Sequence, residues 1–130
     1  YILTICKINF FLLFVFIFVI FSYLLCDAHI RVYNKKDPNE VVVDEFAGQF
    51  IAILGIIDSS NISYILTSLL FSFVLFRFFD ITKIGPIKKF EKLPGGIGII
   101  ADDLVAGLFA FLTQVAILTS TGHPLIIKTL

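Results

Sequence analysis

Acidic residues stand in pairs near the ends of long apolar segments of this chain. Asp44 and Glu45 begin one such segment, and Asp102 and Asp103 begin another. Carboxylates in or near lipid are costly unless a cation neutralises them. Ligands that are all oxygen select Mg²⁺, Mn²⁺ or Ca²⁺ over zinc, and a carboxylate-held Mg²⁺ keeps positions open for water and phosphate. The four carboxylates therefore predict a divalent-cation site equipped for phosphoryl transfer at a lipid headgroup.

Two basic residues and a glycine cluster in the same regions are suited to phosphate. Arg77 can bind two phosphate oxygens at once, although its i,i+3 spacing also allows a pair with Asp80. Lys83 could add a second cation. Gly95 and Gly96 stand just before a predicted helix, whose first backbone N–H groups could cradle phosphate. A glycine cluster alone is a common loop feature, and acidic residues also favour helix N-termini, but the joint occurrence of these features favours a site.

The composition places these residues in a membrane protein. The 130 residues are 58% hydrophobic and only 15% charged, and their mean hydropathy is +1.01. A soluble domain carries about 25% charged residues, and a chain of this length cannot bury so much apolar surface in one core. We therefore predict an all-α polytopic membrane bundle that forms a single domain over residues 1–130 and has about four transmembrane helices. The predicted spans are residues 8–26, 41–57, 62–79 and 99–120.

Following these spans through the membrane brings the acidic residues to one face. The first span ends on that face, the second begins there, the third returns to it and the fourth leaves it. Of the ten Lys and Arg residues, only Lys7 and Lys128 fall on the other side. The positive-inside rule therefore makes the acidic face cytoplasmic.

Small residues in line with the carboxylates predict close helix packing. They form two groups, one in the second span and one in the fourth, so the carboxylates are expected to point into a helix contact and not toward lipid. The residues are Gly48, Ala52 and Gly55, and Ala106, Gly107 and Ala110.

Several other polar residues have simpler interpretations. Residues 88–92 read KKFEK and resemble an interfacial segment, whose lysines serve topology or bind anionic lipid headgroups. Asp37 before Pro38 is typical of a turn, and Asp27 of a loop or helix end. The two histidines lack a partner at ligand spacing, and no feature supports nucleic-acid binding.

Three ordered segments resemble the phosphatidylglycerophosphatase A family. Residues 37–49 read DPNEVVVDEFAGQ, similar to the D-P-x-x-[IV]-V-x-D-E-x-x-G-Q segment of the family. Residues 76–83 read FRFFDITK, similar to its F-R-x-x-D-x-x-K segment. Residues 95–107 read GGIGIIADDLVAG, similar to its G-G-x-G-I-x-x-D-D-x-x-A-G segment. The resemblance is specific because the three motifs occur in order.

The resemblance implies an Mg²⁺-dependent phosphatase of the bacterial inner membrane, with its site on the cytoplasmic side. The implied reaction removes the terminal phosphate of phosphatidylglycerophosphate and leaves phosphatidylglycerol. By similarity, Asp80 would be a further metal ligand or would accept a proton from attacking water. No Ser or Cys nucleophile is evident, so the attacking group is either an Asp, which would form a phosphoaspartate, or an activated water. The working residues implied by similarity are Asp44, Glu45, Arg77, Asp80, Lys83, Asp102 and Asp103.

The chain departs from the family pattern at two places. Ile84 stands where the family has a proline after the motif lysine. A P-G-T-x-G-S run expected before the first full span is absent, so we expect the chain to lack an N-terminal segment of the family. The alternative function is a non-enzymatic membrane protein that uses the carboxylate cluster as a cation site. That alternative predicts acidic residues at mid-membrane, whereas here they stop near one face.

Overall fold

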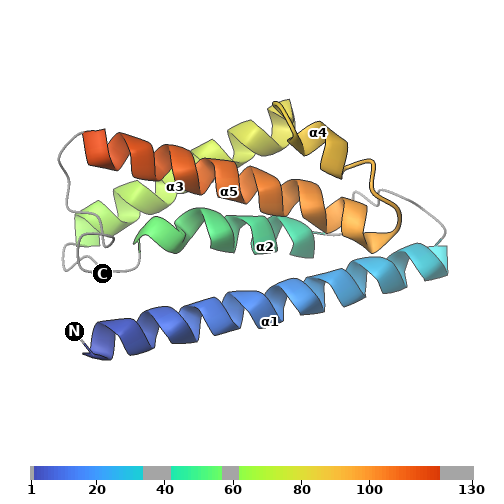
Figure 1. Ribbon diagram of the computed structural model, residues 1–130, viewed down its shortest axis with the longest axis horizontal. Coiled ribbons are helices and arrows are strands. Elements are labelled where there is room, and N and C mark those ends of the chain that lie inside the picture. Colours follow the sequence, from blue (N-terminus) through green and yellow to red (C-terminus); the bar gives the residue numbers. More distant parts are fainter. Residues whose placement is uncertain (1, 34–41, 57–61, 121–130) are drawn as a thin grey trace.

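The protein is a bundle of helices, shown as a computed structural model in Figure 1. The structure describes residues 2–33, 42–56 and 62–120, and no strand occurs among them. The predicted all-α class is therefore confirmed. Helix α2 lies between α1 and α5 and packs most extensively on α5, while α3 packs mainly on α5 and also contacts α2. The elements are α1 (Ile2–Tyr33), α2 (Val43–Ala52), the 3₁₀ helix η1 (Ile53–Ile56), α3 (Ile62–Thr82), α4 (Ile87–Phe90) and α5 (Gly96–Ser120).

Three helices in the described part of the chain are long and apolar enough to cross a membrane, which agrees with a polytopic bundle. They comprise Asn9–Tyr33, Ile62–Thr82 and Gly96–Ser120. The segment predicted as the second span, residues 41–57, is different in kind. Its described part forms α2, of 10 residues, and η1, of 4 residues. At 1.5 Å per residue α2 is about 15 Å long, half of the ~30 Å hydrocarbon core.

The three long helices extend beyond the predicted spans. Helix α1 continues from the predicted end at Cys26 to Tyr33, so Asp27 lies inside a helix and not at its end. No Gly or Pro interrupts this stretch, and Asp27 and Arg31 form an i,i+4 ion pair of 2.7 Å that supports the extra turns. Polar helix ends beyond the apolar run lie outside the hydrocarbon core, where hydropathy gives no signal.

Glycines allow α2 and α5 to approach closely, as the small residues predict. A Cβ atom at Gly48 would lie 2.5 Å from the carbonyl oxygen of Asp103 and 2.6 Å from a ring carbon of Phe76. A Cβ at Gly107 would collide with the carbonyl group of Gly48. Ala52, Ala106 and Ala110 are fully buried in the same contact. Gly55 lies in η1, and its packing falls outside the described side chains.

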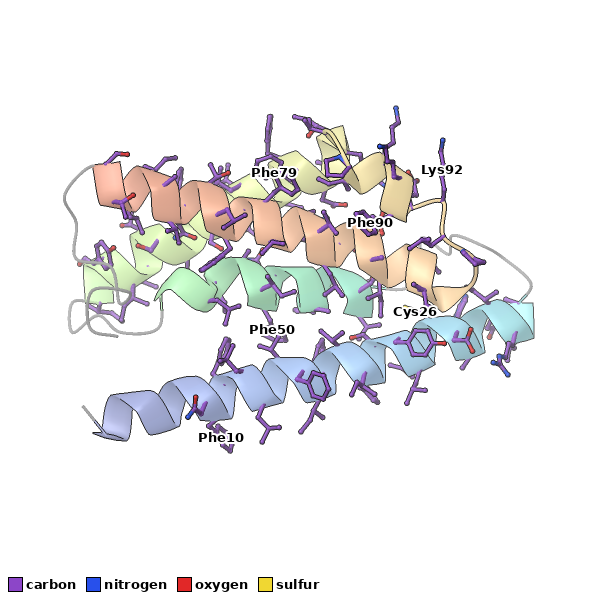
Figure 2. All side chains as sticks on the ribbon, viewed as in Figure 1. Phe10, Cys26, Phe50, Phe79, Phe90 and Lys92 are labelled. Atoms are coloured by element: carbon purple, nitrogen blue, oxygen red, sulfur yellow. The ribbon has the colours of Figure 1, made fainter. Side chains whose placement is uncertain are left out.

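Helix α1 packs on α2 through aromatic rings and one hydrogen bond. Phe50 points from α2 toward α1 (Figure 2), where its ring meets those of Phe14 and Phe18 edge-on, with centroids 5.4 and 5.0 Å apart. Nearer the other end, the hydroxyl of Ser22 donates to the carbonyl of Val43 at 3.3 Å. Since Val43 is the first residue of α2, this bond holds the start of α2 against α1.

Candidate active site

The start of α2, the end of α3 and the start of α5 meet at one end of the bundle. Asp44, Asp102 and Asp103 are buried there, with 7%, 8% and 5% of their surface exposed. They lie in the contact between helices and do not face lipid, as expected from their alignment with the small residues. Burying several carboxylates together in an apolar bundle is costly, so the arrangement requires compensating cations.

Arg77 connects α3 to α2 at this end. Its Nη2 atom lies 2.8 Å from Oε2 of Glu45, and its Nη1 atom lies 3.0 Å from Oδ2 of Asp80. The two arms of the guanidinium therefore hold one carboxylate each. Arg77 and Glu45 remain about one third exposed, with 37% and 35% of their side-chain surface accessible. The two ion pairs therefore fix the orientation of the Arg77 guanidinium, while solvent or a ligand can still reach it.

Lys83 is the second cation, and the backbone holds it in an unusual conformation. Its φ of 44° lies in the left-handed region, just after α3 ends at Thr82. Its Nζ atom lies 2.8 Å from Oδ2 of Asp102 and 3.0 Å from Oε1 of Glu91. A lysine in this region costs about 1 kcal/mol or more, which the ion pairs offset. Burial lowers the pKa of Lys83, but the hydrogen bonds to Asp102 and Glu91 outweigh it and raise the pKa above its ordinary value. The ammonium group therefore stays charged.

The inner part of the site is formed by carboxylates and one thiol. Asp44 accepts a hydrogen bond from the backbone N–H of Glu45 at 3.0 Å. Asp103 lies within electrostatic reach of Asp44, Asp102 and Asp80. Cys26 of α1 is fully buried, and its thiol lies within reach of Asp44 and Asp103. Helix α1 therefore closes the site on one side, while Glu45 and Arg77 leave it accessible on another.

The donor chemistry of the site fits a divalent cation. Oδ1 of Asp102 is buried and has no hydrogen-bond partner among the described residues, although the other oxygen of this carboxylate binds Lys83. A buried carboxylate oxygen without a partner is the kind of atom that a cation or water satisfies. In the described ranges, no three or more His, Cys, Asp or Glu side chains are placed so that they could hold a metal together. Mg²⁺ normally uses one or two carboxylates together with water and substrate phosphate, so the site remains suited to it.

The glycines at the start of α5, Gly95 just before it and Gly96 as its first residue, contact α1. A Cβ at Gly96 would lie 2.8 Å from the backbone nitrogen of Asp27, and one at Gly95 would lie 3.7 Å from Oδ1 of the same residue. Gly95 also has a φ of 68°, which favours glycine. The structure thus gives both glycines a packing role against α1. Their suggested role in binding phosphate stays a prediction.

The structure also adds residues that the sequence did not single out. Glu91, in the segment that connects α3 and α5, forms an ion pair with Lys83. The spacing of the two residues in the sequence does not predict this contact. Cys26 and Asp27 reach the site from α1, where only the length of that helix could have indicated them. Asp37, predicted as a turn residue, lies outside the described residues.

The sequence model of phosphatidylglycerophosphatase A matches residues 1–118, which is most of the chain. This chain belongs to the phosphatidylglycerophosphatase A family. The matched range contains every residue that contributes to the buried carboxylates and the two cations. The predicted resemblance is therefore confirmed over the whole site.

Two relatives carry the name of the family, and a third has a different name. A Haemophilus influenzae protein named phosphatidylglycerophosphatase A is 37% identical over 116 residues, covering 88% of this chain and 68% of its own length. An Escherichia coli protein with the same name is 31% identical over 100 residues, covering 76% of this chain and 53% of its own length. A Bacteroides thetaiotaomicron protein with the provisional name phosphatidylinositol-3-phosphatase is 38% identical over 77 residues, or 59% of this chain and 46% of its own length.

The chain spans between about half and two thirds of the length of these curated relatives. No solved structure matches it.

Proposed function

We propose that this protein is a lipid phosphatase that hydrolyses phosphatidylglycerophosphate to phosphatidylglycerol and phosphate, with Mg²⁺ as cofactor. Two relatives named phosphatidylglycerophosphatase A support the reaction. The excess of basic residues on the side of the site supports a cytoplasmic orientation in the bacterial inner membrane. The observation that carries the proposal is the pairing of Arg77 and Lys83 with carboxylates at one end of the bundle.

Arg77 and Lys83 are suited to binding the phosphate and stabilising charge during its transfer. Each cation is already oriented by two carboxylates, so little reorganisation is needed when a phosphate replaces one of them. The guanidinium can offer two N–H groups to two phosphate oxygens. Lys83, held in place by its backbone conformation, would contact the phosphate from the side of α5.

The carboxylates would bind Mg²⁺ and accept protons. Asp102, with its unpartnered Oδ1, would be one ligand of Mg²⁺, and Asp44, Asp103 and Glu45 are the other predicted ligands. Since no three of these side chains are placed to hold a metal together among the described residues, one or two of them would bind the ion along with water and phosphate. When bound, Mg²⁺ would neutralise phosphate charge and lower the pKa of a water. Asp80 is 18% exposed and could accept a proton from attacking water. Cys26 is fully buried, which makes it a poor nucleophile, so attack by an Asp or by water remain the two routes.

A second substrate has support from one relative. The Bacteroides thetaiotaomicron protein is provisionally named for dephosphorylation of a phosphoinositide, which is also a phosphate monoester on a lipid headgroup. Arg77 and Lys83 would bind the phosphate group, which both lipids carry.

The test is phosphate release from purified protein in detergent micelles. Phosphatidylglycerophosphate, phosphatidylinositol 3-phosphate and a soluble phosphate monoester are compared, each with Mg²⁺ or with a chelator. Faster release from phosphatidylglycerophosphate that stops with chelator supports the proposal. Faster release from the phosphoinositide would show that the second substrate is the preferred one. Mg²⁺ binding by a folded protein that releases no phosphate from any of the three would favour the non-enzymatic cation site.

A further inference from the structure

The segment that connects α3 and α5 carries three lysines that the proposed reaction does not use. Lys88 and Lys89 lie in α4, and Lys92 follows it. All three are exposed, and none forms an ion pair with another described residue. Figure 2 shows Lys92 pointing away from the bundle. Since Lys83 is held by Asp102 and Glu91, the three exposed lysines form a separate basic surface.

The position of this surface places it at the membrane boundary. Helices α3 and α5 are both long and apolar enough to cross a bilayer, and the segment joins the end of one to the start of the other. A connection between two spanning helices begins and ends where the hydrocarbon core meets the headgroup region. The lysines therefore face headgroups and the water next to them.

Apolar residues fix the segment at this height. Ile87 is fully buried in the core of the bundle and anchors α4 to it. Phe90 and Ile84 are 38% and 50% exposed, and they border the lysines in sequence. Exposed apolar side chains beside lysines are typical of segments that lie in the interface, with the apolar groups inserted among lipids and the charges among headgroups.

We propose that Lys88, Lys89 and Lys92 bind the headgroups of anionic phospholipids of the surrounding leaflet, and so gather a local shell of anionic lipid beside the site. The charge of the surface, the absence of ion-pair partners for it among the described residues, and its height in the membrane favour this occupant. A purely topological role for the lysines predicts no such shell. The two readings differ in a measurable quantity, the ratio of anionic to neutral lipid next to Phe90.

The chain contains no Trp, so one substitution creates a unique fluorescent reporter. The Phe90→Trp protein is placed in bilayers of equal amounts of phosphatidylserine and phosphatidylcholine, with brominated acyl chains on only one of the two lipids. Quenching by each brominated lipid then reports its local share, and no catalysis is needed. Leu66→Trp, at the opposite end of α3 and 59% exposed, is the matched control.

The proposal predicts that brominated phosphatidylserine quenches the Phe90→Trp protein more strongly, with a local enrichment of about fivefold, the factor that one effective basic residue provides. The enrichment should fall in 1 M salt, where the Debye length is about 3 Å. Changing the three lysines to Gln should remove it, and changing them to Arg should keep it. Leu66→Trp should show no preference.

Equal quenching of Phe90→Trp by the two lipids would overturn the proposal, and so would a preference that survives in the Gln variant. The Arg variant guards against a folding artefact, because it alters the same positions and keeps their charge. Circular dichroism of each variant confirms that its helices are intact.

Discussion

At the scale of single residues, Arg77 and Lys83 are each held between two carboxylates that come from different parts of the chain. The sequence motifs predicted both cations and three of these four carboxylates, because residue type and spacing were sufficient to indicate them. Glu91 was missed because its contact with Lys83 depends on the path of the loop and on the left-handed backbone at Lys83. Spacing along a helix carries no information about such a contact.

Replacing Asp103 or Asp44 with Asn should stop turnover and leave the fold intact. The change removes a charge from the buried cluster and keeps the side-chain volume, so kcat should fall by at least about 100-fold. The check is phosphate release, with circular dichroism as the test of folding. Arg31→Gln is the control, because it also removes one charge and the Arg31 side chain is 79% exposed. Full activity in both site variants would reject the assignment of these residues.

Arg77→Lys should weaken the site although the charge is kept. Lysine cannot hold Glu45 and Asp80 with two arms of one planar group, so at least one charge-assisted hydrogen bond is lost. The expected fall in kcat/KM is about tenfold or more. Kinetics of the Lys and Gln variants measure this. Equal kinetics for wild type and Arg77→Lys would show that the fork geometry is unimportant.

At the scale of elements, the long apolar helices could be predicted and their ends could not. Hydropathy located α1, α3 and α5 because lipid-facing runs of that length have few other interpretations. It missed the last turns of α1, which are polar and carry Asp27 to the site. It also could not show that α2 is a short helix, because an apolar segment of that length fits either a span or a helix packed inside the bundle.

Gly48→Ala should separate α2 from α5. A methyl group there meets the backbone of Asp103 and the ring of Phe76, so the helices must shift, at a cost of about 1–3 kcal/mol in the free energy of unfolding. Unfolding in detergent, followed by circular dichroism, measures the change. Leu108→Ala, at a position that is 45% exposed, should have a much smaller effect. Equal stability of Gly48→Ala and wild type would contradict the close contact between the helices.

At the scale of the whole molecule, the fold collects charge at one end and leaves the rest apolar. The acidic cluster, its two cations and the basic segment around α4 all lie where α3 ends and α5 begins. Charge balance alone did not predict this, because the chain has equal numbers of acidic and basic residues. The predicted order of four spans indicated it, because each span was expected to reverse the side of the membrane, although the second forms the short helix α2.

This arrangement predicts the topology of α5. In a background where both cysteines are replaced, Lys92→Cys should react with an impermeant maleimide only from the cytoplasmic side. Ser120→Cys, at the far end of α5, should react only from the opposite side. Labelling of intact cells and of inverted vesicles gives the two accessibilities. Labelling of both positions from one side would show that α5 does not cross the membrane.

We propose that the buried carboxylates and the paired cations form one Mg²⁺-dependent phosphate site. Its most direct test is phosphate release from phosphatidylglycerophosphate as Mg²⁺ is titrated, for wild type and for Asp102→Asn. We expect no release without Mg²⁺, saturation in wild type, and a large loss of kcat or a higher Mg²⁺ requirement in Asp102→Asn. Release that persists with chelator, or an identical Mg²⁺ titration for the two proteins, would contradict it.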